Sequence, residues 1–442
     1  MNLSYSRRRF LRTTALGLGV AGLPHWYRSE AQDASASASA ATVSPNDRPR
    51  IALVGCGNRG KAVAKRMERF GDVVSVCDVD ASRVEAAKAL FAGARGWKDF
   101  RDAVADDGVD VVLCGTVDHW HALVSIAAME AGKDVYCEKP LTLTIDEGRR
   151  IADAARRTGR VLQTGSQQRS AANFRMACEL VRNGRLGALQ SVETWLPAGP
   201  KEGPFRAAAI PNGLDWDLWK GPTPDVAYVP ERCHRYFRYW YEYSGGTMTD
   251  WGAHHNDIAL WALDRERSGP TQIVGRAVGS MIDGGYTAAS EFDVTYTYED
   301  GLVHRCRSTR DASPSGVAQG AKQQHHGIRF VGEKGWIWVT RWSIEASNPA
   351  FLETPLPSNA TRLPVSGDHE GNFFDAVKRR ASPICDAEIG HRSASICHLG
   401  VLSMRLGREL SWDPVAEQFV GDDEANGWLA RDRRDPWDWE RG

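Results

Sequence analysis

The chain has 442 residues, of which 55 are Lys or Arg and 56 are Asp or Glu, so its net charge is −1. This balance gives no general electrostatic attraction for nucleic acid, and we expect no nucleic-acid partner. A hydrophobic fraction of 42% is typical of a globular protein and excludes a mainly disordered or fibrous chain. No uncharged apolar run long enough to span a membrane follows the first 30 residues, so we expect no stable membrane insertion after processing.

The amino terminus has the pattern of an export signal. Residues Ser6 to Arg12 follow the twin-arginine pattern SRRxFLK, and the uncharged run Thr13 to Pro24 comes next. Small residues then place a cleavage site near Ala31. A Sec signal also has a basic start and an apolar core, but the ordered arginine pair, the Phe and the Gly-rich core favour the twin-arginine route. The sequence therefore predicts a signal peptide over residues 1–31 and a protein that is periplasmic or otherwise exported.

This route has consequences for the next segment and for any cofactor. Residues 32–48 are mostly Ala, Ser, Pro and Asp in low-complexity order, which predicts a disordered linker. The twin-arginine export machinery, an expected partner, carries proteins that are already folded. A cofactor is then loaded in the cytosol before export.

The first regular elements carry a dinucleotide-binding fingerprint. The apolar strand Ile51 to Val54 precedes the run Gly55-Cys56-Gly57-Asn58-Arg59-Gly60, which opens a helix, and the next strand ends at Asp78. Gly55 permits the tight turn, Gly57 lets the backbone approach a pyrophosphate, and Gly60 lets helix and strand approach closely. Asp78 accepts hydrogen bonds from ribose hydroxyls and repels a 2′-phosphate. The sequence therefore predicts NAD rather than NADP, a preference that the nearby Arg83 weakens.

Alternating strands and helices continue to residue 164 and predict a Rossmann domain over residues 49–168. The strands end at Asp78, Thr116, Glu138 and Gly165. Because the carboxyl ends of the strands line the crevice of a doubly wound sheet, these positions mark the ligand-binding edge. In residues 169–413, runs that alternate apolar with polar residues predict an antiparallel sheet with one covered face in a second domain.

A long segment rich in aromatic residues lies between the first two strands of the second domain. It contains Trp216, Trp219, Tyr228, Tyr236, Phe237, Tyr239, Trp240, Tyr241 and Tyr243, together with Arg232, His234, Arg235 and Arg238. Rings and arginines of this kind suit a saccharide pocket, but they are equally typical of a subunit interface or a local core. The sequence leaves these alternatives open. The Trp-rich tail, residues 414–442, is predicted to pack on the body or on a neighbouring subunit.

No spacing of Cys or His predicts a metal site. The nine cysteines include no CxxC or CxxxC pair, and we favour small buried hydrophobes over disulfides for them. The pairs His254-His255 and His325-His326 point to different sides of an element, and no carboxylate-rich companion accompanies them at ligand spacing. We therefore expect no catalytic metal.

Five short motifs occur in order along the chain. They are GCGNRG at residues 55–60, CDVD at 77–80, GTVDHWH at 115–121, CEKP at 137–140 and GGTMTDWGAHHNDIALW at 245–261. In this combination the chain resembles the Gfo/Idh/MocA family of NAD(P)-dependent oxidoreductases from about residue 50 to residue 413. The resemblance implies an α/β Rossmann domain followed by an α+β domain with a large open antiparallel sheet. It also implies a sugar, cyclic polyol or glycoside as substrate and, by analogy, a homo-oligomer. One departure is Thr116-Val117 where the family often has TP.

The resemblance implies three catalytic residues. Hydride transfer from an alcohol needs a base for the hydroxyl proton and a cation beside the oxygen. Lys139 matches the lysine of the family's EKP motif and is the expected cation, although its position alone indicates a solvated loop lysine. Asp250 and His254 match the family's acid–base dyad; four residues apart on one helix, they share a face, so the carboxylate is expected to orient the imidazole and raise its basicity. Without the resemblance, a helix cap and a buried structural histidine are the simpler interpretations.

Further site residues come from the fingerprint, the strand ends and the family motifs. The expected cofactor-binding residues are Gly55, Gly57, Asn58, Arg59, Gly60, Asp78, Thr116, His119, His121 and Glu138. The expected substrate-binding residues are Gln167, Arg169, Tyr236 and His255. His119 and His121 are equally consistent with solvent-facing positions at a helix start, and His255 with a structural hydrogen bond.

The sequence thus predicts an exported NAD-dependent oxidoreductase that transfers a hydride between the hydroxyl of a sugar, cyclic polyol or glycoside and a tightly bound nicotinamide. His254 is expected to take the proton while Lys139 stabilises the oxygen. One alternative is an NAD-dependent glycoside hydrolase or lyase that oxidises its sugar transiently. A second alternative is a saccharide-binding protein without catalysis.

Overall fold

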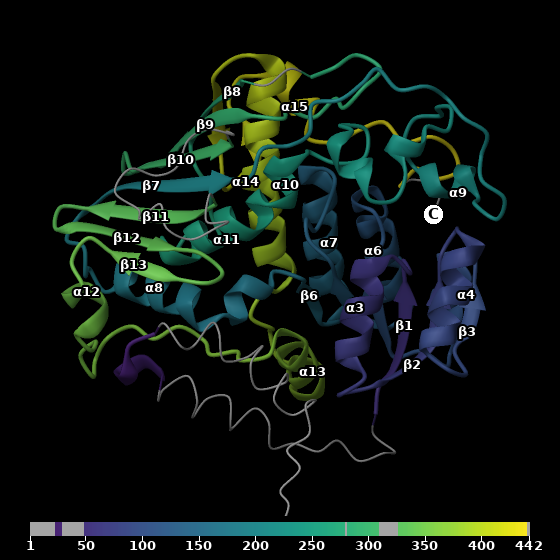
Figure 1. Cartoon of the computed structure of the whole chain (residues 1–442), viewed down its shortest axis with the longest axis horizontal. Coiled ribbons are helices and arrows are strands. Elements are labelled where there is room, and N and C mark those ends of the chain that lie inside the picture. Colours follow the sequence, from purple (N-terminus) through teal and green to yellow (C-terminus); the bar gives the residue numbers. More distant parts are fainter. Residues whose placement is uncertain (1–22, 29–47, 279–280, 309–325, 440–442) are drawn as a thin grey trace, which may run out of the picture.

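The first domain is built on a parallel sheet. The computed structural model describes residues 23–28, 48–278, 281–308 and 326–439 (Figure 1). In this part of the chain the sheet has the strand order β3-β2-β1-β4-β5-β6, with every pair parallel. Its strands are β1 Arg50–Val54, β2 Asp72–Cys77, β3 Arg95–Trp97, β4 Val111–Cys114, β5 Asp134–Cys137 and β6 Leu162–Thr164. β4 and β5 are buried along their whole length, and all their residues except Asp134 are apolar or aromatic or cysteine, as in strands covered on both faces.

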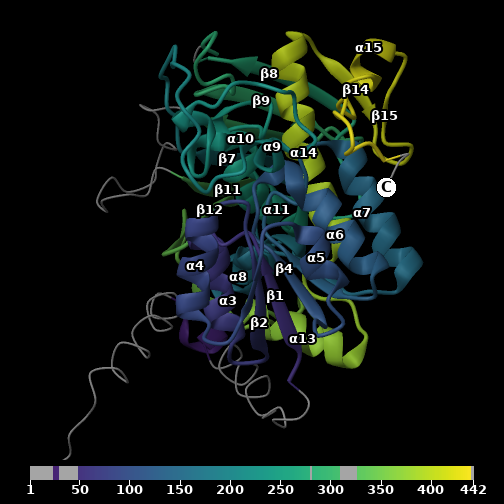
Figure 2. The same ribbon diagram turned by 90° about the vertical axis from the view of Figure 1, so that its right-hand side faces the viewer.

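Helices cover both faces of this sheet (Figure 2). They are α3 Asn58–Met67, α4 Ala81–Leu90, α5 Phe100–Ala105, α6 His121–Glu130 and α7 Ile145–Thr158. Val63 and Met67 of α3 belong to one hydrophobic cluster, to which Phe373 of α13 (His369–Arg379) also contributes. Val124 of α6 and Ile151 of α7 belong to a second cluster. The carboxyl ends of the strands are left free to form a site.

The second domain is built on a larger sheet. Within the described residues it has nine strands in the order β13-β12-β11-β7-β10-β9-β8-β14-β15. All pairs are antiparallel except β7 with β10, which are parallel. The strands are β7 Leu189–Leu196, β8 Gln272–Ala277, β9 Phe292–Thr297, β10 Val303–Ser308, β11 Gly327–Gly332, β12 Gly335–Val339, β13 Ile344–Ala346, β14 Leu410–Asp413 and β15 Gln418–Phe419. The predicted fold class, a Rossmann domain followed by an α+β domain, is confirmed.

Helices cover one face of this sheet, and one of them also contacts the first domain. α8 (Ala172–Arg182), α11 (Gly252–Ala262) and α14 (Ala387–Leu406) pack on the strands, while α12 (Ala350–Glu353) lies beside β13. α14 also packs against α7, where a Cβ added at Gly148 would lie 2.2 Å from His391 Nδ1. Arg149 of α7 forms ion pairs of 2.8 Å with Glu388 and Glu417. This contact fixes the two domains against each other. No helix in the described residues is long and apolar enough to cross a lipid bilayer.

The aromatic segment between β7 and β8 forms a local core. It carries α9 (Trp216–Lys220), two 3₁₀ turns (Pro230–Arg232 and Tyr236–Tyr239) and α10 (Thr247–Asp250). Trp216, Trp219, Trp240 and Tyr243 are buried in one cluster. Trp216 and Trp219 stack with their centroids 4.7 Å apart. The sequence left open a saccharide pocket, a subunit interface and a local core for this segment. These four rings form a local core.

The end of the tail lies on the first domain. After α15 (Asp423–Asn426) the chain returns to the beginning of α6 and to α7. The Trp437 ring lies against Trp120 with a centroid distance of 4.7 Å. The Trp439 ring lies 5.1 Å from the guanidinium carbon of Arg150.

Part of the predicted signal peptide packs on the second domain. Leu23 and Tyr27 are fully buried in the cluster that contains residues of α8 and β11. The guanidinium carbon of Arg175 lies 5.0 Å from the centre of the Tyr27 ring, and Trp26 Nε1 donates to the oxygen of Leu352 at 2.8 Å. The predicted cleavage near Ala31 would remove these contacts. The rest of this predicted segment, and the predicted linker up to residue 47, lie outside the described residues.

A protein that begins at residue 32 is therefore expected to be less stable than one that begins at residue 23. Loss of two buried side chains, Leu23 and Tyr27, removes about 3–6 kcal/mol of hydrophobic stabilisation, at about 1.5–3 kcal/mol each. Thermal unfolding followed by circular dichroism compares the two proteins, with Leu23→Ala in the longer one as an intermediate case. Equal melting temperatures would contradict a structural role for this segment.

Candidate functional site

The glycine loop after β1 leaves space at the amino terminus of α3. Gly55 has a φ of +92°, and a Cβ added there would lie 2.5 Å from the carbonyl oxygen of Gly115. A Cβ at Gly60 would lie 2.2 Å from the oxygen of Gly55. Gly57 is the residue before α3, and no side chain at this position caps the first N–H groups of the helix. The amino terminus of α3 therefore has the donors that a bound phosphate uses.

A cavity of about 440 Å³ begins at this loop and is lined by residues of both domains. The expected cofactor-binding residues that line it are Gly55, Gly57, Asn58, Arg59, Asp78 and Thr116. Apolar walls come from Val117, Trp120, Trp219 and Phe237. Gly60 lies beneath the loop, and Glu138 holds Arg59 through a bond of 2.7 Å between Oε1 and Nε. Backbone donors, apolar walls and a carboxylate in one cavity fit an adenine dinucleotide.

Asp78, at the end of β2, is fixed by backbone donors. Its Oδ2 accepts from the N–H of Cys56 at 2.8 Å, and its Oδ1 accepts from the N–H of Asp80 at 3.0 Å. Burial raises the pKa of this carboxyl, and Arg83 opposes the rise. Arg83 and His234 line the same part of the cavity, and burial lowers the pKa of His234 to about 4. A carboxylate and two basic side chains thus meet where a dinucleotide fingerprint places the adenosine ribose.

Lys139 follows β5 and reaches into the second domain. Its Nζ donates to Asp250 Oδ1 at 2.5 Å and to the backbone oxygen of Asp250 at 2.8 Å. Arg238, which lines the cavity, approaches the other carboxylate oxygen with its Nε at 3.7 Å. Burial acts to raise the pKa of Asp250, but Lys139 and Arg238 outweigh it and hold this pKa below its ordinary value. An ionised carboxylate therefore positions the ammonium group of Lys139.

His254 is a buried, neutral imidazole near this pair. Its Nδ1 has no hydrogen-bond partner among the described residues. Burial, Lys139 and Arg341 lower its pKa well below the ordinary value. This corrects the expectation that Asp250 raises the basicity of His254. The reason is that burial disfavours the charged imidazole, that cationic side chains approach His254, and that Asp250 binds Lys139.

Three expected site residues are held elsewhere by the protein. His119 Nε2 lies 2.9 Å from the oxygen of Trp219, and burial lowers the pKa of His119 to about 3. His255 is fully buried, with its ring nitrogens at 3.1 Å from Gln168 and from His326. Arg169 is 1% exposed and forms a bidentate ion pair with Asp257, both N–O distances being 2.8 Å. The structure therefore places none of the three against the cavity.

Two further expected substrate-binding residues, Tyr236 and Gln167, do not make the contacts that were expected of them. Tyr236 is 47% exposed and does not line the cavity. Gln167 begins the 3₁₀ turn Gln167–Ser170, but its neighbour Gln168 makes the contact with the site. Gln168 Nε2 donates to the oxygen of His254 at 3.3 Å, and its Oε1 accepts from Arg341 Nε at 3.0 Å. The sequence did not single out Gln168 or Arg341.

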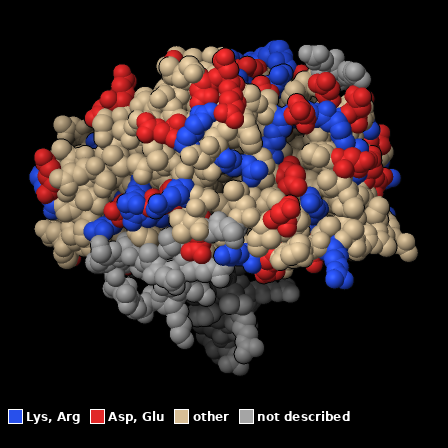
Figure 3. All heavy atoms as spheres, turned by 90° about the horizontal axis from the view of Figure 1, so that it is seen from above, with Lys and Arg blue, Asp and Glu red and all other residues tan. Residues whose placement is uncertain are grey.

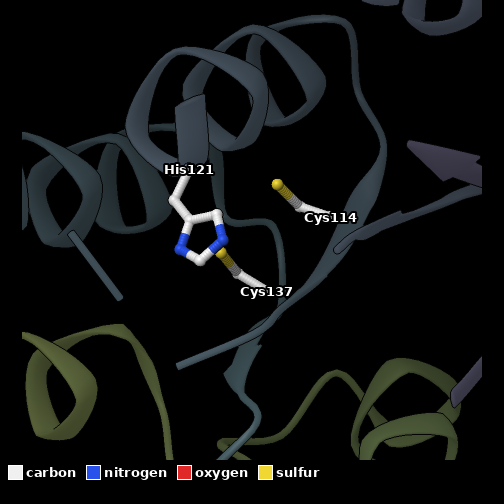
Figure 4. Close-up of side chains that lie close together, drawn as sticks. All are labelled: Cys114, His121 and Cys137. Atoms are coloured by element: carbon white, nitrogen blue, oxygen red, sulfur yellow. The ribbon is translucent and has the colours of Figure 1, made fainter. Parts of the chain in front are cut away.

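His121 lies close to two cysteines, Cys114 and Cys137 (Figure 4). The ligand atoms of His121, Cys114 and Cys137 lie within 4.8 Å of one another, and all three residues are buried. The histidine comes from the beginning of α6 and the cysteines from the ends of β4 and β5. His121 Nδ1 lies 2.8 Å from the oxygen of Pro140, which holds the Lys139 turn in place. The described residues supply three possible ligands here, whereas a structural zinc site has four protein ligands and a catalytic one has three and a water. His121 supports the turn and does not line the cavity, contrary to expectation.

The surface seen in Figure 3 carries both signs of charge. Over the described residues of this face, Lys and Arg side chains are interspersed with Asp and Glu side chains. A nucleic-acid-binding face is typically a continuous basic patch. This face has no such patch among its described residues.

Two family models match the chain. The description "Oxidoreductase family, NAD-binding Rossmann fold" belongs to the model that matches residues 49–166. The description "Oxidoreductase family, C-terminal alpha/beta domain" belongs to the model that matches residues 198–439, more than half of the chain. Both models carry the name GFO_IDH_MocA, the second with the suffix C2.

Curated relatives and solved structures are similar to parts or to most of the chain. Inositol 2-dehydrogenase 3 of Saccharopolyspora erythraea is 36% identical over 221 residues, which are 49% of this chain and 54% of that protein. The chain thus spans about half the length of the curated relatives it matches. The WlbA dehydrogenase of Bordetella pertussis, in complex with NADH and UDP-GlcNAcA, has a TM-score of 0.62 at 20% identity, covering 83% of this chain and 99% of that chain. A levoglucosan dehydrogenase in complex with NADH and L-sorbose has a TM-score of 0.60 at 18% identity, covering 82% and 98%. At these identities the likeness to solved structures shows the fold.

Proposed function

The chain belongs to the Gfo/Idh/MocA oxidoreductase family, and from this premise we propose that it is an NAD-dependent sugar or polyol dehydrogenase. Its substrate is a sugar, cyclic polyol or glycoside with an oxidisable hydroxyl. The relatives named inositol 2-dehydrogenase and levoglucosan dehydrogenase support this class of substrate. The observation that carries the proposal is the Lys139–Asp250 pair with the neutral His254 beside it, next to Arg238 at the cavity wall.

The site residues divide the chemistry among them. Bound in the cavity, NAD supplies the acceptor for a hydride. His254, being neutral, takes the hydroxyl proton of the substrate. Lys139 donates a hydrogen bond to the alcohol oxygen as negative charge develops there. Asp250 keeps the ammonium group in position, so the donor is oriented before the substrate binds.

The acid limb of the pH–rate profile is expected below about pH 6.5, the ordinary pKa of histidine. Because the pKa of His254 is lowered, the imidazole stays neutral and able to accept a proton as the pH falls through 6.5. In Arg341→Gln one of the charges that lower this pKa is removed, so the limb should move toward neutral pH. The dependence of kcat/KM on pH measures both shifts. A wild-type limb above pH 6.5 would contradict this role for His254.

NAD is proposed as the cofactor, and NADP is less favoured, because the carboxylate of Asp78 repels a 2′-phosphate. We expect the nucleotide to be tightly held and to copurify with the protein. Spectroscopy of the nucleotide released on denaturation, with enzymatic discrimination between NAD and NADP, checks this. Release of NADP alone would contradict the preference for NAD and would indicate that Arg83 and His234 bind the 2′-phosphate.

Export by the twin-arginine route is part of the proposal. The pattern of residues 6–12 supports it, and a tightly held cofactor suits a compartment with no obvious pool of free NAD. The expected location is the periplasm or another place outside the cytoplasm. A homo-oligomer is proposed by family analogy, and light scattering of the purified protein measures its mass.

One assay separates the proposed activity from the alternatives. The purified protein is incubated with sugars, inositols and aryl glycosides while nicotinamide absorbance and aglycone release are followed together. A net absorbance change supports the dehydrogenase. Aglycone release without a net change overturns it in favour of a hydrolase or lyase that oxidises its sugar transiently. Saccharide binding without either signal overturns it in favour of a binding protein.

A further inference from the structure

The catalytic site contains more positive than negative side chains. Its described carboxylates are Glu138, Asp250 and the buried Asp118, whose charge interacts with Arg238 and Lys139. Arg59 pairs with Glu138 at 2.7 Å, and Lys139 pairs with Asp250 at 2.5 Å. These two pairs are balanced. Of the two further guanidinium groups, that of Arg238 faces Asp118 and Asp250, so the positive charge in excess is that of Arg341.

Arg238 shares a carboxylate that is already occupied. Its Nε lies 3.7 Å from Asp250 Oδ2, a distance longer than a hydrogen bond. The same carboxylate accepts from Lys139 through Oδ1. Arg238 also lines the cavity, so its remaining N–H donors lie next to the space in which ligands bind.

Arg341 has no carboxylate partner among the described residues. It follows β12 at a turn, where its Nε donates to the neutral Gln168 Oε1 at 3.0 Å. Its guanidinium carbon lies 4.5 Å from the centre of the ring of Trp251, which follows Asp250 in the chain. Burial and the charge of Arg59 lower the pKa of Arg341, while Asp250 opposes this. A half-buried guanidinium that is oriented by an amide and an aromatic ring, and not neutralised by an acid, is typical of an anion-binding position.

We propose that Arg341, assisted by Arg238, binds a carboxylate carried by the substrate, so that the preferred substrate is a sugar acid and not a neutral sugar. This inference rests on the proposed function, because it assigns the substrate class to the same site. A planar guanidinium can bind a carboxylate with two parallel hydrogen bonds, whereas a hydroxyl takes only one of them. Arg238 lies next to Asp250 and Arg341 next to Trp251, the residue that follows Asp250 in the chain.

The electrostatics of His254 agree with an anionic ligand. Arg341 is one of the charges that keep the pKa of His254 low. A bound carboxylate compensates that charge, so the imidazole becomes a better proton acceptor once the substrate is present. A neutral sugar offers no such compensation.

Calorimetric binding to the NADH-loaded protein tests the inference without turnover. The probes are D-glucuronate, D-galacturonate, D-glucose and glucose 6-phosphate. We expect a uronate to bind at least about 10-fold more tightly than glucose, which corresponds to about 1.4 kcal/mol, and the difference to decrease at high salt. Equal binding of uronates and glucose overturns the inference. Tighter binding of glucose 6-phosphate than of either uronate also overturns it, because the anion is then a phosphate.

Variants assign the effect to the side chain. Arg341→Gln should reduce uronate affinity by at least about 10-fold, with NADH affinity and glucose affinity unchanged. Arg341→Lys keeps the positive charge but lacks the planar guanidinium with its two parallel donors. Its uronate affinity should therefore lie between those of the wild type and Arg341→Gln. Arg276→Gln on β8 is the matched control, and it should leave all affinities unchanged. Retention of uronate preference in a folded Arg341→Gln protein overturns the inference.

The two proposals fail in distinguishable ways. Oxidation of neutral sugars with no uronate preference leaves the dehydrogenase intact and removes the carboxylate site. Tight uronate binding that depends on Arg341, without any change in nicotinamide absorbance when the same uronates are added to the sugar panel, supports the carboxylate site and overturns the dehydrogenase.

Discussion

Replacement of Lys139 by methionine is expected to lower kcat/KM by about 10²–10³-fold, the usual cost of removing a donor to a developing oxyanion. Lys139 Nζ is held by two oxygens of Asp250 at 2.5 and 2.8 Å, so it is oriented before a substrate binds. Methionine preserves much of the length of the side chain but has no charge. The cavity walls at Gly55 and Asp78 are not altered, so the loss should be in kcat and not in cofactor affinity. Steady-state kinetics and NADH fluorescence titration measure the two quantities.

Lys65→Met is the matched control for this change. The Lys65 side chain lies on α3, is 57% exposed and pairs with Glu68. Exposed ion pairs contribute about 0–1 kcal/mol, so neither activity nor stability should change measurably. Lys139→Arg keeps the charge with a different donor geometry and should recover part of the activity. If Lys139→Met retains kcat/KM within about threefold, Lys139 is not the donor.

The glycine loop could be predicted from the sequence because most of its requirements are local. Gly55 and Gly60 meet each other and the end of the neighbouring strand β4, so their lack of a side chain follows from the strand–turn–helix pattern itself. The same holds for Asp78, whose partners are the N–H groups of Cys56 and Asp80. The contacts of Gly60 with Gly55 and of Asp78 with Cys56 form within one βαβ unit, which the fingerprint describes, whereas the contact of Gly55 with Gly115 comes from the neighbouring strand β4.

The partner of Asp250 could not be predicted in this way. A spacing of four residues brings two side chains together only on a continuous helix, which was the basis for pairing Asp250 with His254. The structure has a break there, because α10 ends at Asp250 and α11 begins at Gly252. Lys139, from the other domain, donates a hydrogen bond to the Asp250 carboxylate instead. Composition also could not separate a sugar pocket from a core in the aromatic segment, since both use the same residue types.

Arg169 and Arg341 show how contacts between residues far apart in the chain determine a role that position in the sequence does not predict. Arg169 follows the last strand of the first domain, where a substrate contact is a reasonable expectation, but Asp257 on α11 binds it in the core. Arg341 follows an ordinary hydrophobic strand, and no local pattern distinguishes it from other turn arginines. Its proximity to Trp251 and Gln168 arises only when the two domains and the sheet are assembled.

Arg169→Met is expected to destabilise the protein by about 3–5 kcal/mol, the cost of leaving one charge of a buried pair without its partner. Arg169 is 1% and Asp257 0% exposed, and two bonds of 2.8 Å join them. Ser393 Oγ also donates to Asp257 Oδ1 at 2.5 Å, but a single hydroxyl does not neutralise a carboxylate. The melting temperature should therefore fall strongly. The KM for the substrate should not change in the folded fraction, because the guanidinium does not line the cavity.

The double variant Arg169→Met/Asp257→Leu separates a structural pair from a functional one. Removing both charges eliminates the unpaired carboxylate, and well-packed apolar replacements of a buried ion pair are often neutral or stabilising. The double variant should thus be more stable than Arg169→Met alone. Arg50→Met is the control, since Arg50 and Asp110 are 46% and 45% exposed and such a pair contributes little. If Arg169→Met instead melts like the wild type but shows a raised KM, Arg169 contacts the substrate as its position in the sequence indicated, and the buried pair is not what holds these helices together.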